Sequence, residues 1–174
     1  LFLALAAMPA RAGKIVLYFY DNIGNGTAVA DLTNNALYPT GFDDQTTLGL
    51  GTGQPVFGYD PGALNIDNYG ASARGYLEVP VTGNYKFFIR SDDASELRLS
   101  PDGNPANAVR IAYEPACCNG FVDDGVRSSA LIPLEQGKQY YVEALYKEGG
   151  GGDWFQVGWQ LPDVIFYPTG GGTG

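Results

Sequence analysis

The chain has 174 residues, a net charge of −9 and no histidine. This length suits one domain with a sizeable hydrophobic core. The negative charge argues against nucleic acid as a partner, because nucleic acid binding needs a basic surface. The absence of histidine removes the commonest general base and transition-metal ligand, so zinc sites and Ser-His-Asp catalysis are both disfavoured. An acidic surface suits a secreted protein and a hard cation such as calcium.

The chain opens with an apolar run, residues 1–8, and an A-x-A site follows at residues 10–12. This pattern is typical of the end of a secretory signal peptide, and the run is too short to span a membrane. We therefore expect an extracellular location, either secreted or on the cell surface. Two interpretations of residues 1–12 stay open, a signal-peptide remnant or an apolar extension that contacts a neighbouring subunit. The second assigns that contact to Leu1, Phe2, Leu3 and Leu5.

The other end of the chain carries a β-prone stretch, Val164 to Tyr167, before a glycine-rich tail. A short apolar strand at a chain end can complete the sheet of a neighbouring subunit by strand addition. The same contact repeated head to tail makes a filament. The sequence therefore predicts one domain over residues 13–163 and a tail over residues 164–174. One hypothesis is that copies of the chain assemble into a filament or oligomer.

Most of the chain has the periodicity of β-strands. Ile15 to Tyr20 is a continuous apolar run that suits a buried strand. Residues 40–73 are rich in turn formers, so we expect a long irregular connection there, with room for short strands. Beyond the N-terminal run, no stretch shows a convincing helical period. The remaining segments predict strands: Gly75–Val81, Tyr85–Arg90, Glu96–Ser100, Val109–Tyr113, Ala130–Leu134, Gln139–Tyr146 and Phe155–Leu161. The pattern predicts an all-β fold, an antiparallel β-sandwich or barrel in a single domain with long loops.

Two local motifs leave alternatives open. Cys117 and Cys118 are the only cysteines, and their adjacency does not fit a zinc site. A vicinal disulfide, bonds to a neighbouring chain and free thiols are all compatible with this spacing. Asn25 begins an Asn-x-Thr sequon, which is either a glycosylation site or simply part of a glycine-rich turn.

The carboxylates that stand out are Asp92 and Asp93, adjacent at the end of a predicted strand. A second acidic loop, Glu148 to Asp153, encloses four glycines and follows another predicted strand. Loops of an antiparallel sandwich gather at its two ends, so these segments are candidates to meet. Calcium takes about six to eight oxygen ligands, and a glycine run leaves its carbonyl groups free to turn inward. The alternative is a solvated turn and a flexible loop tip.

From Val16 to about Pro162, the chain resembles the domain first named for the anthrax toxin protective antigen, the PA-fourteen domain. The residues that carry the resemblance are RGYLEVPVTGNYKFFIRSDDASELRLSPDGNPAN and LIPLEQGKQYYVEALYKEGGGGDWFQVGWQLP. The resemblance implies a β-sandwich or barrel of the kind found in adhesins, toxins, glycosidase inserts and surface proteins.

The resemblance also implies a site. In sugar-binding members of this family, two consecutive aspartates joined by a cis peptide hold calcium, and a second loop adds a side chain and main-chain carbonyls. A sugar then supplies hydroxyl groups to the ion. Asp92 and Asp93 match the aspartate pair, and Trp154 is placed either beside a sugar or in the core. The second loop corresponds to Glu148, the carbonyls of Gly150 and Gly152, and Asp153, although flocculin loops are shorter and usually use Asn.

These features predict a secreted, non-catalytic calcium-binding module that self-assembles into an extracellular filament or surface structure. The alternative is a calcium-dependent carbohydrate-binding module, with glycans as partners. An enzyme is disfavoured because no Ser or Cys nucleophile stands beside a base. Asp92 and Asp93, adjacent in one turn, are also not the opposed pair that a glycosidase needs.

Overall fold

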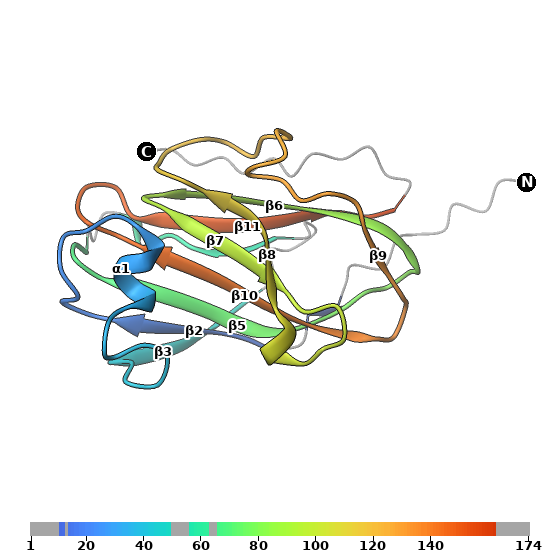
Figure 1. The fold of residues 1–174 in the computed structure, drawn as a ribbon, viewed down its shortest axis with the longest axis horizontal. Helices are drawn as coiled ribbons and strands as arrows, with labels where there is room; N and C mark the ends of the chain where they lie inside the picture. The colour runs from blue at the N-terminus through green and yellow to red at the C-terminus, as the bar shows by residue number, and fades with distance from the viewer. Residues whose placement is uncertain (1–10, 13, 50–55, 63–65, 163–174) are drawn as a thin grey trace, which may run out of the picture.

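The computed structural model describes residues 11–12, 14–49, 56–62 and 66–162, which form two packed antiparallel sheets (Figure 1). The larger sheet has the strand order β3-β2-β5-β10-β7-β8, and β1 pairs with the end of β5. Its strands are β1 (Arg11–Ala12), β2 (Ile15–Tyr20), β3 (Asp44–Leu48), β5 (Gly70–Glu78), β7 (Ser95–Leu99), β8 (Val109–Glu114) and β10 (Gln139–Lys147). The smaller sheet has the order β4-β11-β6-β9. Its strands are β4 (Val56–Tyr59), β6 (Gly83–Asp92), β9 (Ile132–Leu134) and β11 (Trp154–Gln160).

The core lies between the two sheets and is rich in aromatic side chains. Alternation along β6 turns Phe87 and Ile89 inward, and alternation along β11 does the same for Trp159; all three are at most 1% exposed. Leu97 and Val142 face them from the larger sheet and are fully buried. The antiparallel β-sandwich that the apolar alternation predicts is therefore confirmed.

A short helix, α1 (Val29–Thr33), covers the outer face of the larger sheet (Figure 1). Val29 and Leu32 are buried there in a second apolar cluster with Tyr20, Ala94 and Leu145. The sequence showed no helical period at this point, so α1 was not predicted. A helix of five residues is less than two turns long, so it cannot show a repeating apolar period.

The described residues of the segment read as a long irregular connection, residues 40–73, contain two short strands and the start of a third. β3 is an edge strand, and four of its five residues are exposed, so it lacks the alternation of a half-buried strand. β5 begins at Gly70, ahead of the predicted Gly75. A single turn of 3-10 helix, Pro105–Asn107, precedes β8.

The terminal segments assigned to assembly, residues 1–10 and 164–174, lie outside the described residues. That prediction covers Leu1, Phe2, Leu3 and Leu5, and it stays a prediction. Within the ranges that the structure describes, no helix has the length and apolar character that a bilayer crossing requires.

Candidate functional site

Two connections between the sheets meet at one end of the sandwich, on the left in Figure 1. The aspartate turn, Asp92-Asp93, passes from β6 in the smaller sheet to β7 in the larger one. The glycine loop, Glu148 to Asp153, passes back from β10 to β11. Because β6 pairs with β11 and β7 pairs with β10, both connections open at the same end.

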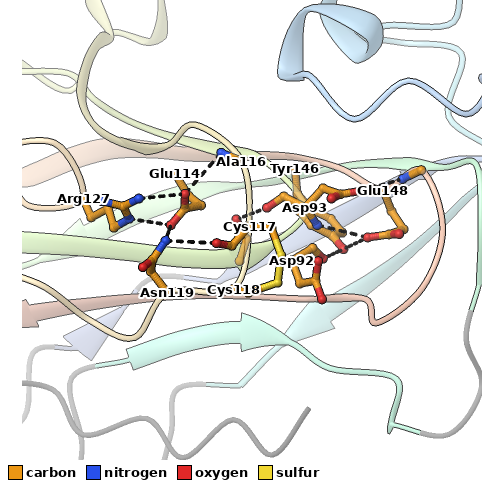
Figure 2. Close-up of a disulfide and its surroundings, with 12 residues drawn as sticks. Asp92, Asp93, Glu114, Ala116, Cys117, Cys118, Asn119, Arg127, Tyr146 and Glu148 are labelled. Atoms are coloured by element: carbon orange, nitrogen blue, oxygen red, sulfur yellow. Dashed lines mark hydrogen bonds and ion pairs between the residues drawn. A yellow bond between two sulfur atoms is a disulfide. The ribbon is translucent and has the colours of Figure 1, made fainter.

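Hydrogen bonds join the aspartate turn to the glycine loop directly. The N–H of Asp93 donates to Oε2 of Glu148 at 3.1 Å, and the N–H of Gly149 donates to Oδ2 of Asp93 at 3.1 Å. The Asp92-Asp93 peptide is cis. The hydroxyl of Tyr146, a residue of the buried core, lies within hydrogen-bonding distance of both the carbonyl of Asp92 and Oε2 of Glu148, and its single proton is shared between these two acceptors. The turn is thus held from the interior as well as from the loop (Figure 2).

Two carboxylate oxygens at this end are buried without a hydrogen-bond partner. Glu148 is fully buried, and its Oε1 has no partner. Asp153 is 3% exposed; its Oδ2 accepts from the N–H of Ile66 and from Tyr69, whereas its Oδ1 has no partner. A buried carboxylate oxygen without a partner is costly, so each favours a proton, an ordered water molecule or a cation as its partner.

Burial is the main influence on the pKa values of these groups. Burial raises the pKa of Glu148 to about 7, and the charges of Asp93 and Asp92 act in the same direction. Burial, followed by the charge of Asp93, raises the pKa of Asp92. Burial also raises the pKa of Asp153. The site therefore disfavours its own ionised carboxylates as long as no cation balances them.

A second pair of consecutive aspartates, Asp123-Asp124, has cationic partners. Asp123 forms an ion pair with Lys86, and Asp124 forms one with Arg127. Among the described residues, no ion pair involves Asp92, Asp93, Glu148 or Asp153. An Asp-Asp dipeptide alone therefore does not identify the site. The position of Asp92-Asp93 at the end of β6 does.

Further segments, which sequence reasoning missed, complete this end. The N–H of Gly151 donates to Oδ1 of Asp67 at 3.3 Å, and the N–H of Asn68 donates to the carbonyl of Gly149 at 3.3 Å. The fully buried Lys147 donates to the carbonyl of Gly24 at 2.8 Å and so ties the N-terminal loop to the site. Asp67 lies in the segment read as irregular, where only its acidic character could have drawn attention.

Gly149 marks the tightest contact between these loops. A Cβ atom at this position would lie 2.8 Å from the carbonyl oxygen of Asn25 and 2.8 Å from Cγ2 of Thr27. At Gly150 the nearest atom would be Oδ1 of Asp67 at 3.6 Å, an ordinary contact. At Gly152 it would be Oδ2 of Asp92 at 2.9 Å. The backbone of the loop thus lies directly against the acidic groups. Asn25, the residue of the sequon, is exposed.

Cys117 and Cys118 are joined to each other by a disulfide, the first of the arrangements that the sequence left open. It lies beside the aspartate turn (Figure 2). In the part of the chain that the structure describes, one set of three acidic or cysteine ligand atoms lies within 4.8 Å of one another, that of Asp92, Cys117 and Cys118. The four carboxylates that the sequence singled out surround this end without converging on one point.

Trp154 lies outside the core. It pairs with Asp92 across β6 and β11, and it is partly exposed on the outward face of the smaller sheet. The guanidinium carbon of Arg90 lies 4.9 Å from its ring and 5.0 Å from the ring of Phe121. The indole is accessible to a ligand, because it is partly exposed and lies beside Asp92.

Comparison with known proteins gives partial matches to much longer chains. Human fibrocystin-L is 37% identical over 85 residues, which are 49% of this chain and 2% of that protein. A mouse enzyme, N-acetyl-beta-glucosaminyl-glycoprotein 4-beta-N-acetylgalactosaminyltransferase 1, is 28% identical over 163 residues, 88% of this chain and 15% of the enzyme. The chain thus spans only a small part of the curated relatives it matches.

Solved structures share the fold. The A domain of epithelial adhesin 9 from Candida glabrata, in complex with Galβ1-4GlcNAc, has a TM-score of 0.58 at 13% identity, covering 90% of this chain and 85% of that one. The PA14 domain of the MpAFP antifreeze protein has a TM-score of 0.54 at 14% identity, covering 88% and 84%. Residues 18–168 match the family described as the PA14 domain. With most of its length inside that match, the chain belongs to the PA14 domain family.

Proposed function

We propose that the chain is a calcium-dependent carbohydrate-binding module whose site lies between the aspartate turn and the glycine loop. The observation that carries the proposal is the pair of partnerless, buried carboxylate oxygens, Oε1 of Glu148 and Oδ1 of Asp153. They lie at the acidic end of the sandwich. Among the described residues, no carboxylate of this end takes part in an ion pair. A cation bound at this end would relieve the deficit of either oxygen that it contacts.

The donor atoms at this end fit a hard cation. Carboxylates and main-chain carbonyls are the ligands that calcium prefers. Asp92 and Asp93 would supply carboxylates, and the glycine loop would add the carboxylates of Glu148 and Asp153 with the carbonyls of Gly150 and Gly152. Bound calcium would offer free coordination positions to a ligand, because Asp92 and Asp93 are only partly buried.

Adjacent hydroxyl groups of a sugar are suitable ligands for such an ion. The adhesin domain that shares this fold was solved with Galβ1-4GlcNAc, so β-galactosides are the first candidates. We infer no catalysis, because Asp92 and Asp93 belong to one turn and do not face each other across a substrate as glycosidase carboxylates do. We also infer an extracellular location, in keeping with the adhesin whose fold it shares.

Self-assembly into a filament is the less supported role. It depends on the two terminal segments, which lie outside the described residues. The site between the aspartate turn and the glycine loop, in contrast, is built from described residues, so carbohydrate binding takes precedence here.

The test is a glycan array that includes Galβ1-4GlcNAc, probed with and without calcium. The wild-type chain should bind in calcium and lose binding in EDTA. The double variant Asp92→Asn/Asp93→Asn should not bind in either condition. The matched control is Asp43→Asn/Asp44→Asn, which removes the same charge from another pair of consecutive aspartates. In that pair, Asp43 accepts a hydrogen bond from the N–H of Asp21. The control variant should bind as the wild type does. No binding to any glycan in calcium, or binding that survives EDTA, would contradict the proposal.

A further inference from the structure

The Cys117–Cys118 disulfide lies against the aspartate turn at the protein surface (Figure 2). Both sulfur atoms and a carboxylate oxygen of Asp92 lie within 4.8 Å of one another, and Cys118 is exposed. A disulfide has no proton to donate and its sulfur atoms are weak acceptors, so it presents an apolar surface. An apolar surface is thus placed directly beside a carboxylate of the proposed ion site.

The disulfide is held firmly in that place. The N–H of Cys118 donates to the carbonyl of Ser91 at 2.8 Å, and Cys117 forms a β-bridge with Asp92. Behind it, the carboxylate of Glu114 is fully buried and organises the loop that carries the cysteines. This carboxylate accepts from four donors on three residues: Ala116 N (3.2 Å), Asn119 Nδ2 (3.2 Å), and Arg127 Nε (2.6 Å) and Nη2 (3.2 Å). The disulfide is therefore part of a built surface and not the tip of a loose loop.

A second apolar group lies on the opposite side of Asp92. On β6, Asp92 pairs with Trp154 across one edge and with Cys117 across the other. Side chains directly opposite each other on neighbouring strands project from the same face of a sheet. Asp92 is consequently flanked by an indole on one side and by the disulfide on the other, all on the outward face of the smaller sheet.

This arrangement complements the chemistry of a pyranose ring. Such a ring offers hydroxyl groups along its edge and C–H groups on its face, so it can bind an ion and pack on an apolar surface at once. We propose that the Cys117–Cys118 disulfide is a sugar-contact surface, against which the C–H face of a pyranose packs while its hydroxyl groups reach the ion at the aspartate turn. This inference rests on the proposed function, because it needs the ion to orient the ring.

The experiment compares the wild type with Cys117→Ser/Cys118→Ser, both in calcium and in EDTA. Two readouts are recorded for each protein, the calcium-dependent rise in Tm and the Kd for Galβ1-4GlcNAc. We expect the variant to keep the calcium-dependent rise in Tm and to bind the disaccharide about tenfold or more weakly. A variant with the wild-type Kd would overturn the sugar-contact role and leave the proposed function intact. A wild type that binds no glycan in calcium would overturn both.

A measurement on the unaltered protein guards against a variant that misfolds. Methyl β-galactoside is added to the calcium-loaded wild type, and intermolecular NOEs are recorded to the β-protons of Cys117 and Cys118. We expect NOEs to the ring C–H protons of the sugar. If the bound sugar shows NOEs to Trp154 and none to either cysteine, the disulfide is not the contact surface.

Discussion

The main-chain N–H of Asp93 donates a 3.1 Å hydrogen bond to Oε2 of Glu148, 55 positions further along the chain. This bond connects two of the segments at which the chain passes between the sheets. It also orients the carboxylate whose other oxygen, Oε1, is buried without a partner. The pairing of Asp93 with Glu148 therefore sets the position of the oxygen that we assign to the ion.

Calcium added to chelator-treated protein should raise its Tm, because the ion binds the folded state and not the unfolded one. At a concentration about 100-fold above Kd, we expect a rise of roughly 5–10 °C, measured by calorimetry. Glu148→Gln keeps the shape of the side chain and removes its charge, so it should shrink the rise. A Tm that is the same in calcium and in EDTA would rule out an ion at this site.

Gly149→Ala should destabilise the protein by about 1–3 kcal/mol, because the new methyl group would overlap the carbonyl of Asn25 and the methyl group of Thr27. It should also weaken calcium binding by displacing the glycine loop. The matched control is Gly150→Ala, whose methyl group would meet nothing nearer than 3.6 Å. Urea unfolding of both variants measures the difference. Equal stability of the two variants would mean that the loop adjusts without cost.

Arg127→Met should lower the free energy of unfolding by roughly 3 kcal/mol, because it leaves the buried carboxylate of Glu114 without its cation. Adding Glu114→Gln to it should restore part of the loss, since the second change removes the unpaired charge. The control is Lys138→Ala, which breaks an exposed pair with Glu135 and should leave the stability unchanged. Chemical denaturation checks all three. A double variant no more stable than Arg127→Met would show that charge is not the cause.

Deleting residues 1–12 should leave a soluble monomer if the apolar N-terminal run joins one subunit to the next. Light scattering after size-exclusion chromatography compares the shortened chain with the full one. Filaments or oligomers that persist without these residues would refute the assembly hypothesis, and so would a full chain that is already monomeric.

Much of the sandwich could be predicted because its strands are half-buried and alternate. Tyr85–Arg90 was recognisable in this way, whereas Ile15–Tyr20 was recognisable as a continuous apolar run. β3 was not, because an exposed edge strand does not need apolar residues on alternate positions. α1 was missed because five residues are too few to show a helical period.

The site was predictable in part for a similar reason. The aspartate turn and the glycine loop stand out by composition, and the sandwich fold brings loop ends together. The contributions of Asp67 and Gly24 depend on long-range contacts between irregular segments, which leave no pattern in the sequence. The pairing of Asp92 with both Trp154 and Cys117 depends on strand register, which alternation alone does not specify.

Tyr146 has a mechanical consequence for a molecule held at this end of the sandwich. Its hydroxyl group holds the carbonyl of Asp92, while its ring packs in the core beside Tyr69 and Phe155. It belongs to β10, which lies between β5 and β7 inside the larger sheet. Tension on a captured ligand would therefore pass through Tyr146 into an interior strand and be shared by the ladders on both of its sides.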